Sequence, residues 1–357
     1  MKLSGTHVTI IVVAIVVLFM GMGWFTYKVG TDDEEEVNTE IVDESDKPEN
    51  DKPEKNSSEK GKSTTKKSNK KENTKVEEEE DDPYKELDEL IGLEQVKREV
   101  HELADFVKVQ KLREEQGLKV PNMSYHLVFT GNPGTGKTTV ARIVARIYKD
   151  LGILKQGHTV ETDRSGLVAE YMGQTAIKTN HIIDSALNGV LFIDEAYALV
   201  PDGKHSGGDY GQEAISTLLK RMEDDRDKLV VIIAGYTDEM KTFINSNPGL
   251  QSRFNRYIDF PDYTSDELTE IFKMYVRKNQ YTIDSETETY LRQQLDYIVS
   301  HKDRNFGNAR YVRNVFEKAI QNQANRVSKV NNPTSDMLIR ITKEDIEKAI
   351  AGVKRSI

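Results

Sequence analysis

The sequence predicts an α/β domain, in which helices cover a parallel β-sheet, followed by a smaller all-helical unit. Between residues 124 and 263, short apolar runs rich in β-branched residues alternate with segments of helical length. From Ser265 onward nearly every segment is an amphipathic helix, whereas residues 31–82 contain few apolar side chains. These shifts in pattern divide the chain into residues 1–30, 31–82, 83–263 and 264–357.

The first part contains an apolar segment, Val8 to Phe25, that carries no charge and is close to the shortest helix able to cross a bilayer. Trp24 and Tyr27 lie at its end, where aromatic rings favour the headgroup region. We expect an uncleaved N-terminal transmembrane helix. A cleaved signal peptide is the alternative, but no small-x-small cleavage site follows the apolar run.

The second part, residues 31–82, consists mainly of charged and small polar residues and has twice as many acidic residues as lysines. Its excess of ten negative charges equals the net charge of the whole chain, so the rest of the chain is close to neutral. Such a segment buries too little apolar surface to offset its ordering entropy. We expect a disordered linker that acts as a tether, with an electrostatic docking element as the alternative. The neutral remainder has no basic stripe that would indicate nucleic acid.

The third part supplies the strands of the predicted sheet. The expected strands share short length, apolar residues and a helical segment after them, and they lie at residues 124–131, 158–163, 189–196, 228–236 and 257–263. The helices of the last unit begin with Ser, Thr or Asn, several with Glu three residues on, which is typical of helix capping. The chain has no cysteine, which excludes disulfides and thiolate chemistry.

A phosphate-binding loop is predicted directly after the first strand. The stretch GNPGTGKT, Gly131 to Thr138, fits G-x-x-x-x-G-K-[ST] between a strand and a helix. Glycines let backbone N–H groups turn onto phosphates, and the helix N-terminus adds a positive dipole. Lys137 would reach the phosphates, and the hydroxyl of Thr138 would bind Mg²⁺. The predicted ATP-binding residues here are Asn132, Pro133, Gly134, Thr135, Gly136, Lys137, Thr138 and Thr139.

Two acidic residues end a later strand. In GVLFIDEA, four apolar residues lead to Asp194 and Glu195, which would lie at the edge of the sheet where α/β proteins bind ligands. Asp194 would hold Mg²⁺ and Glu195 would polarise the attacking water. The alternative is that the two acids cap the next helix. A GTPase is disfavoured because the sequence has no Asn-Lys-x-Asp element for guanine.

Together with further motifs, these residues resemble an AAA+ ATPase, of the branch that contains stage V sporulation protein K, red-type Rubisco activase and an ATPase domain of type VII secretion. The similarity extends from Tyr84 to about Val353. The motifs that carry it, besides the two above, are LIGLEQVKREV, AEYMGQT, GDYGQEAISTLLKRMED, AGYTDEM, NPGLQSRFNRYIDFPDY and FGNARYVRN. The resemblance implies a P-loop NTPase fold with a C-terminal helical lid and the use of ATP and Mg²⁺.

Individual positions acquire roles through this resemblance. Ile91 and Gly92 would line the adenine pocket, and Arg310 would be the sensor arginine of the lid. Arg253 would be the arginine finger that reaches the nucleotide of a neighbouring subunit, with Arg256 as a second candidate.

Two further positions follow from the same comparison. The strand VVIIAG ends in Tyr236 and Thr237 where many AAA+ proteins place a sensor asparagine, and we expect Thr237 to take that role. Tyr171 in EYMGQT would face the central pore of a hexamer and grip an extended polypeptide; the alternative is an ordinary loop tyrosine.

The predicted function is therefore a Mg²⁺-dependent ATPase that remodels or threads a protein substrate through the central pore of an oligomeric ring. We expect this ring to be a hexamer and expect no nucleic-acid partner. We expect a single-pass membrane protein with its ATPase domain in the cytoplasm, where ATP is available. A nucleotide-gated membrane scaffold with little turnover is the alternative. A zinc protease is disfavoured because HELAD at His101 has Asp105 where the second histidine of His-Glu-x-x-His is required.

Overall fold

The computed structural model describes residues 82–354, except for residue 122, residue 172 and residues 201–209. In this part of the chain, no helix is both long enough and apolar enough to cross a membrane. This finding contradicts the predicted single-pass membrane localisation. The apolar segment of residues 8–25, on which that prediction rested, and the predicted linker before residue 82 lie outside the described residues.

A five-stranded parallel sheet forms the centre of the α/β domain, as the sequence predicts. The strand order is β2-β3-β4-β1-β5, and all neighbours are parallel. The strands are β1 (Leu127–Gly131), β2 (Thr159–Thr162), β3 (Gly189–Ile193), β4 (Leu229–Gly235) and β5 (Tyr257–Phe260). Every residue of β3 and β4 is buried, which is expected of central strands covered on both faces.

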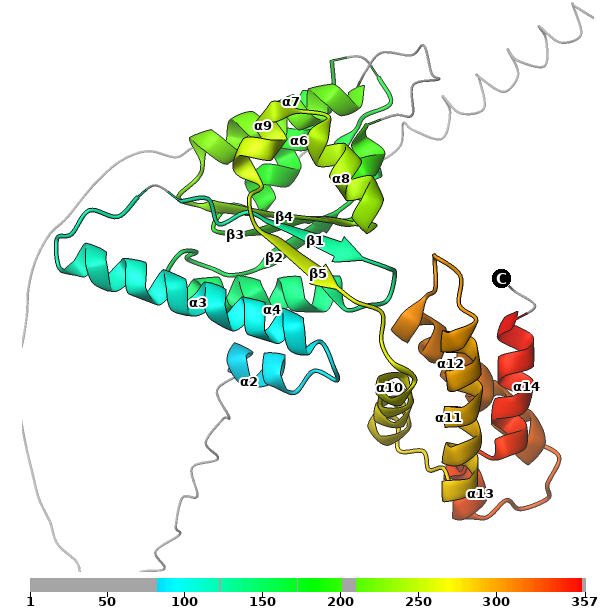
Figure 1. Cartoon of the computed structure of the whole chain (residues 1–357). Coiled ribbons are helices and arrows are strands. Elements are labelled where there is room, and N and C mark those ends of the chain that lie inside the picture. The colour runs from blue at the N-terminus through cyan, green and yellow to red at the C-terminus, as the bar shows by residue number, and fades with distance from the viewer. Residues whose placement is uncertain (1–81, 122, 172, 201–209, 355–357) are drawn as a thin grey trace, which may run out of the picture. The chain divides into compact units, whose positions relative to one another are not determined.

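Helices cover both faces of this sheet (Figure 1). Alternate strand residues such as Phe129 and Ile232 pack on one face with α3 (Glu94–Glu115) and α4 (Lys137–Asp150). Their neighbours, such as Val128 and Ile233, pack on the other face. The elements on that face are α6 (Thr175–Ser185), the 3₁₀ helix η1 (Ala196–Leu199), α7 (Tyr210–Asp224), α8 (Thr237–Asn245) and α9 (Pro248–Arg253). The short helices α2 (Pro83–Asp88) and α5 (Arg164–Leu167) complete the domain.

The C-terminal unit is all-helical, as predicted, and three of its helices, α10, α11 and α13, start at a side chain that caps them. Thr264 and Glu267 form a capping box at the start of α10, and the side chain of Asp284 caps α11. Phe316 anchors the interior, with its ring against those of Phe272 and Tyr275. The helices are α10 (Ser265–Lys278), α11 (Ser285–Ser300), α12 (Asn308–Val327), α13 (Ser335–Ile339) and α14 (Lys343–Lys354).

A buried histidine, His126, lies just before β1. Its Nδ1 accepts the backbone N–H of Val231 at 3.0 Å, so the neutral ring carries its proton on Nε2. Burial lowers the pKa of His126 to about 4, and the positive charge of Arg253 acts in the same direction. The folded protein therefore holds this ring neutral at pH values where the unfolded chain protonates it.

We predict that His126 makes the protein less stable in mild acid. Because the pKa of the ring is lower in the folded state than in the unfolded chain, folding stability is unaffected above about pH 6.5 and falls by roughly 1.4 kcal/mol per pH unit below it. Urea denaturation at pH 7, 6 and 5 measures this slope. His126→Asn keeps an acceptor for Val231 without titrating and should flatten it; equal slopes for both proteins would contradict the assignment.

Candidate functional site

Three neighbouring strands end at one edge of the sheet and deliver the polar residues of the site. The phosphate loop follows β1, Asp194 and Glu195 follow β3, and Tyr236 follows β4. Because β3, β4 and β1 are adjacent and parallel, their carboxyl ends meet. Motifs that are far apart in the sequence therefore lie close together in space.

The loop between β1 and α4 depends on glycine at its closest contact. Gly134 has φ of 71°, and a Cβ there would lie 2.3 Å from the backbone oxygen of Gly307. Only a residue without a side chain allows that approach. The loop is further held by Thr135, whose hydroxyl donates to the oxygen of Asn132 at 2.8 Å.

Lys137 begins α4 and is almost fully buried. Its Nζ donates to the backbone oxygens of Gly131 and Asn132, each at 2.8 Å. Burial lowers the pKa of Lys137 to about 8, against the opposing effect of Asp194. A cation held in a poorly solvated position interacts strongly with an anion brought to the loop.

Asp194 and Glu195 follow the buried strand β3 and differ in exposure. Asp194 is half-buried and accepts the backbone N–H of Glu195 at 3.0 Å, whereas the Glu195 side chain is exposed. Glu195 has φ of 48° and ψ of 43°, a left-handed conformation that non-glycine residues seldom adopt. Strain of this kind is concentrated at functional sites.

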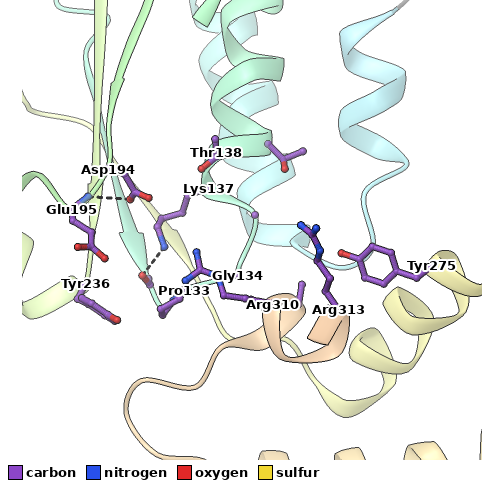
Figure 2. A pocket seen from close by; sticks show the side chains of 15 residues that line it. Pro133, Gly134, Lys137, Thr138, Asp194, Glu195, Tyr236, Tyr275, Arg310 and Arg313 are labelled. Carbon is purple, nitrogen blue, oxygen red and sulfur yellow. Dashed lines mark hydrogen bonds between the residues drawn. The ribbon is translucent and has the colours of Figure 1, made fainter. Parts of the chain in front are cut away.

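A cavity of about 390 Å³ joins these elements (Figure 2). The acids from β3 lie on one side of it, and Arg310 and Arg313 of α12 lie on the other, with Lys137 between them. The lining residues are Gly131, Pro133, Gly134, Gly136, Lys137, Thr138, Thr139, Asp194, Glu195, Gly235, Tyr236, Tyr275, Ala309, Arg310 and Arg313.

The chemistry of this lining fits a nucleoside triphosphate and its metal. Lys137 and Arg310 supply positive charge for phosphates, and the N-terminus of α4 adds its dipole. The oxygens of Thr138 and Asp194 are hard ligands of the kind that Mg²⁺ prefers. When bound, Mg²⁺ neutralises charge on the phosphates.

Some predicted nucleotide contacts lie outside this lining. Gly92 lies beside the start of α10, where a Cβ on it would meet the Glu267 side chain at 2.1 Å, and Ile91 is partly buried against the hydrophobic core. Thr237 begins α8 and does not line the cavity, whereas its neighbour Tyr236 does. Asn132 and Thr135 belong to the loop but do not line the cavity; their side chains instead donate hydrogen bonds that hold the loop in place, to Asp262 and to the Asn132 backbone oxygen.

The predicted arginine finger lies at the other end of the strands. The backbone oxygen of Arg253 accepts from the Ser124 hydroxyl at 2.7 Å, just before β1 begins. The phosphate loop follows the far end of β1, and a strand of this length spans roughly 16 Å. Arg253 contacts Glu223, with Nη2 3.3 Å from the carboxylate, and Arg256 packs over the Phe106 ring.

The predicted pore residue is exposed on a loop. Tyr171 lies between α5 and α6 with 68% of its surface accessible. It is not among the residues that line the cavity.

Several cavity residues were not predicted from the sequence. Tyr275, Ala309 and Arg313 come from the helical lid, and Tyr236 was set aside in favour of Thr237. Arg313 is one helical turn beyond Arg310, so the spacing of three residues on α12 was a usable signal. Tyr275 had no comparable signal, because α10 carries no motif.

Fold and site together define a P-loop nucleotide-binding protein with a helical lid. Residues 127–262 match the family model described as "ATPase family associated with various cellular activities (AAA)", and residues 264–356 match the AAA lid domain. The chain belongs to this AAA ATPase family. It is accordingly an ATPase that uses ATP and Mg²⁺.

Known relatives have the same ATPase core. Stage V sporulation protein K of Bacillus subtilis is 43% identical over 73% of this chain and 81% of its own length. The chloroplastic ribulose bisphosphate carboxylase/oxygenase activase of Cyanidioschyzon merolae is 46% identical over 73% of this chain and 88% of its own length. The ESX-3 secretion system protein EccA3 of Mycolicibacterium smegmatis is 44% identical over 76% of this chain, which spans only 46% of that protein.

A solved structure shares the fold. The FIGL-1 AAA domain, determined in complex with ADP, superposes with a TM-score of 0.51 at 18% identity, covering 74% of this chain and 83% of that one. At this level of identity the similarity concerns the fold alone.

We predict that Lys137→Ala and Glu195→Gln separate binding from turnover. Lys137→Ala removes the buried cation and should abolish nucleotide binding. Glu195→Gln keeps the shape of the side chain but removes the base, so ATP binding should persist while kcat falls at least about 100-fold. Fluorescent-nucleotide titration and phosphate release measure the two effects, and a Glu195→Gln protein that hydrolyses ATP at the parent rate would exclude Glu195 as the base.

Proposed function

We propose that the chain is an ATP-driven protein remodeller that works as an oligomeric ring, a hexamer, and threads a protein substrate through the central pore. Members of the AAA family typically form oligomeric rings and act on protein substrates. The observation that carries the proposal for this chain is Tyr171, a large aromatic side chain that is exposed to solvent on a loop.

The base of this loop is firmly attached while its tip is exposed. The hydroxyl of Thr175 accepts the backbone N–H of Ala169 at 3.1 Å, and the buried Thr179 hydroxyl donates to Leu167 at 3.0 Å. Lys178 donates to the backbone oxygen of Val168 at 3.0 Å. A rigid base allows the loop to transmit force from the α/β domain to a polypeptide that contacts Tyr171.

The same proposal assigns roles at the nucleotide. Lys137 and the loop residues hold the phosphates, Thr138 and Asp194 hold Mg²⁺, and Glu195 activates water. Arg310 joins the lid to the bound nucleotide. The cavity shared by Lys137, Glu195 and Arg310 supports these assignments.

Arg253 is assigned to the active site of a neighbouring subunit. Its distance along the strands from its own phosphate loop supports action between subunits, because the side chain is far too short to reach its own cavity. Hydrolysis would then be a property of the ring.

The domain division and the substrate are also proposals. The matched family models, at 127–262 and 264–356, support a boundary between residues 263 and 264. The relatives are named for sporulation, secretion and Rubisco activation. They suggest no common substrate, so we propose only that the substrate is a protein.

We predict that Tyr171→Ala uncouples hydrolysis from remodelling. The change removes an aromatic contact from every subunit without touching the nucleotide cavity, so ATPase activity should persist while substrate unfolding is lost. A substrate is first captured with the Glu195→Gln protein, and its unfolding is then measured beside steady-state ATPase. Tyr171→Phe, which keeps the ring, should retain unfolding. If the Tyr171→Ala protein still unfolds the substrate at the parent rate, threading by this loop is excluded and a nucleotide-gated scaffold is favoured.

We predict that Arg253→Ala leaves ATP bound but lowers hydrolysis about 1,000-fold, because a finger arginine acts on the transition state. Mixing this protein with Lys137→Ala should restore part of the activity, since some interfaces then pair an intact finger with an intact loop. Arg256→Ala serves as the matched arginine variant and should lose less, because Arg256 packs on Phe106. Absence of recovery in mixed rings would argue against action between subunits.

A further inference from the structure

A buried polar cluster lies where the phosphate loop, the end of β5 and the start of α12 meet. Asn308 is fully buried at its centre. Its Nδ2 donates to Asp262 Oδ1 at 2.7 Å and to the backbone oxygen of Phe306 at 3.0 Å, and its Oδ1 accepts the backbone N–H of Tyr263 at 3.0 Å. One side chain therefore joins the first turn of α12 to the segment that connects the sheet with the lid.

Asp262 extends the cluster to the phosphate loop and to the lid. Its Oδ1 also accepts the Asn132 side-chain amide at 2.9 Å, and its Oδ2 pairs with Lys302. Burial alone would raise the pKa of Asp262, but the hydrogen bonds from Lys302, Asn308 and Asn132 outweigh it and hold the pKa below its ordinary value. The carboxylate is thus ionised and fully engaged near neutral pH.

The backbone at Asn308 explains why asparagine occupies the position. Asn308 has φ of 45° at the first residue of α12, a left-handed conformation that asparagine tolerates better than most residues. This conformation turns the chain sharply into the helix. Both the backbone and the side chain of Asn308 therefore set the direction of α12.

Arg310 follows two residues later and lines the nucleotide cavity. The intervening Ala309 donates its N–H to the backbone oxygen of Gly134 at 3.1 Å. The cluster also bonds the phosphate loop, because Asn308 Nδ2 donates to the backbone oxygen of Pro133 at 3.4 Å, but the loop has further internal bonds through Thr135 and Lys137. Loss of the cluster should therefore disturb Arg310 more than the loop.

We propose that Asn308 and Asp262 are positioning residues that hold Arg310 against the phosphate loop. They touch no nucleotide and act through the direction of α12. The inference rests on the proposed role of Arg310 and is independent of threading by Tyr171.

A double-mutant cycle on steady-state ATPase of the full chain tests this. Asn308→Gly removes the side chain while keeping the left-handed backbone, and should lower kcat/KM for ATP about tenfold in the parent. In an Arg310→Ala background the same change should cost less than about twofold, because the group it positions is gone. Asn314→Ala, an exposed asparagine on the same helix, should change neither background.

Equal tenfold losses in both backgrounds would overturn the proposal, because they would indicate a general structural effect. No loss in the parent would overturn it as well. If Asn308→Gly fails to fold, Asp262→Asn keeps the shape of its side chain and must show the same dependence on Arg310. In the Tyr171→Ala protein, a loss of unfolding without any change in kcat/KM concerns threading alone and does not enter this cycle.

Discussion

The close contact between two backbones, at Gly134 of the phosphate loop and at the start of α12, is the constraint on which the site depends. A Cβ on Gly134 would lie 2.3 Å from the oxygen of Gly307 and 2.8 Å from the nitrogen of Arg310. Any side chain there would separate the lid from the loop. Because Arg310 belongs to the contact itself, the approach of the backbones also fixes where a positive charge enters the cavity.

The charges of the cavity follow from this arrangement. The β3 acids and the α12 arginines occupy opposite sides, and Lys137 lies between them with a pKa lowered by burial to about 8 (Figure 2). Because the arginines belong to the lid, any change in lid position would alter the electrostatic potential of the cavity. Phosphate binding and lid position would then be linked through Coulomb interactions.

Local rules of sequence account for what could be predicted. Buried strands, the glycine-rich loop and the acids after β3 each depend on a few consecutive residues, and all were found in place. Tyr236 and Thr237 were harder, because the last residue before α8 faces the cavity and the next one begins the helix. The contact of Asn308 with Asp262 joins residues 46 apart, and no local pattern indicates it.

The localisation prediction failed for a related reason. It rested on the uncharged apolar run of residues 8–25 and on the aromatic residues at its end, which lie outside the described residues. Within the described ranges no helix meets the length and apolarity that a membrane crossing requires. Hydropathy of a single run is weaker evidence than a motif whose strand and helix context can be checked.

The proposed action of Arg253 between subunits would restrict how copies of this chain assemble. Arg253 and the phosphate loop lie near opposite ends of β1, so Arg253 lies far from the nucleotide cavity of its own subunit. In a two-fold dimer the contacts are reciprocal, so Arg253 of each copy would have to reach the cavity of the other, and only two sites would be completed. A head-to-tail contact instead brings the arginine of each subunit to the cavity of the next. Repeated around a closed rotation, that contact would complete every site of the proposed ring.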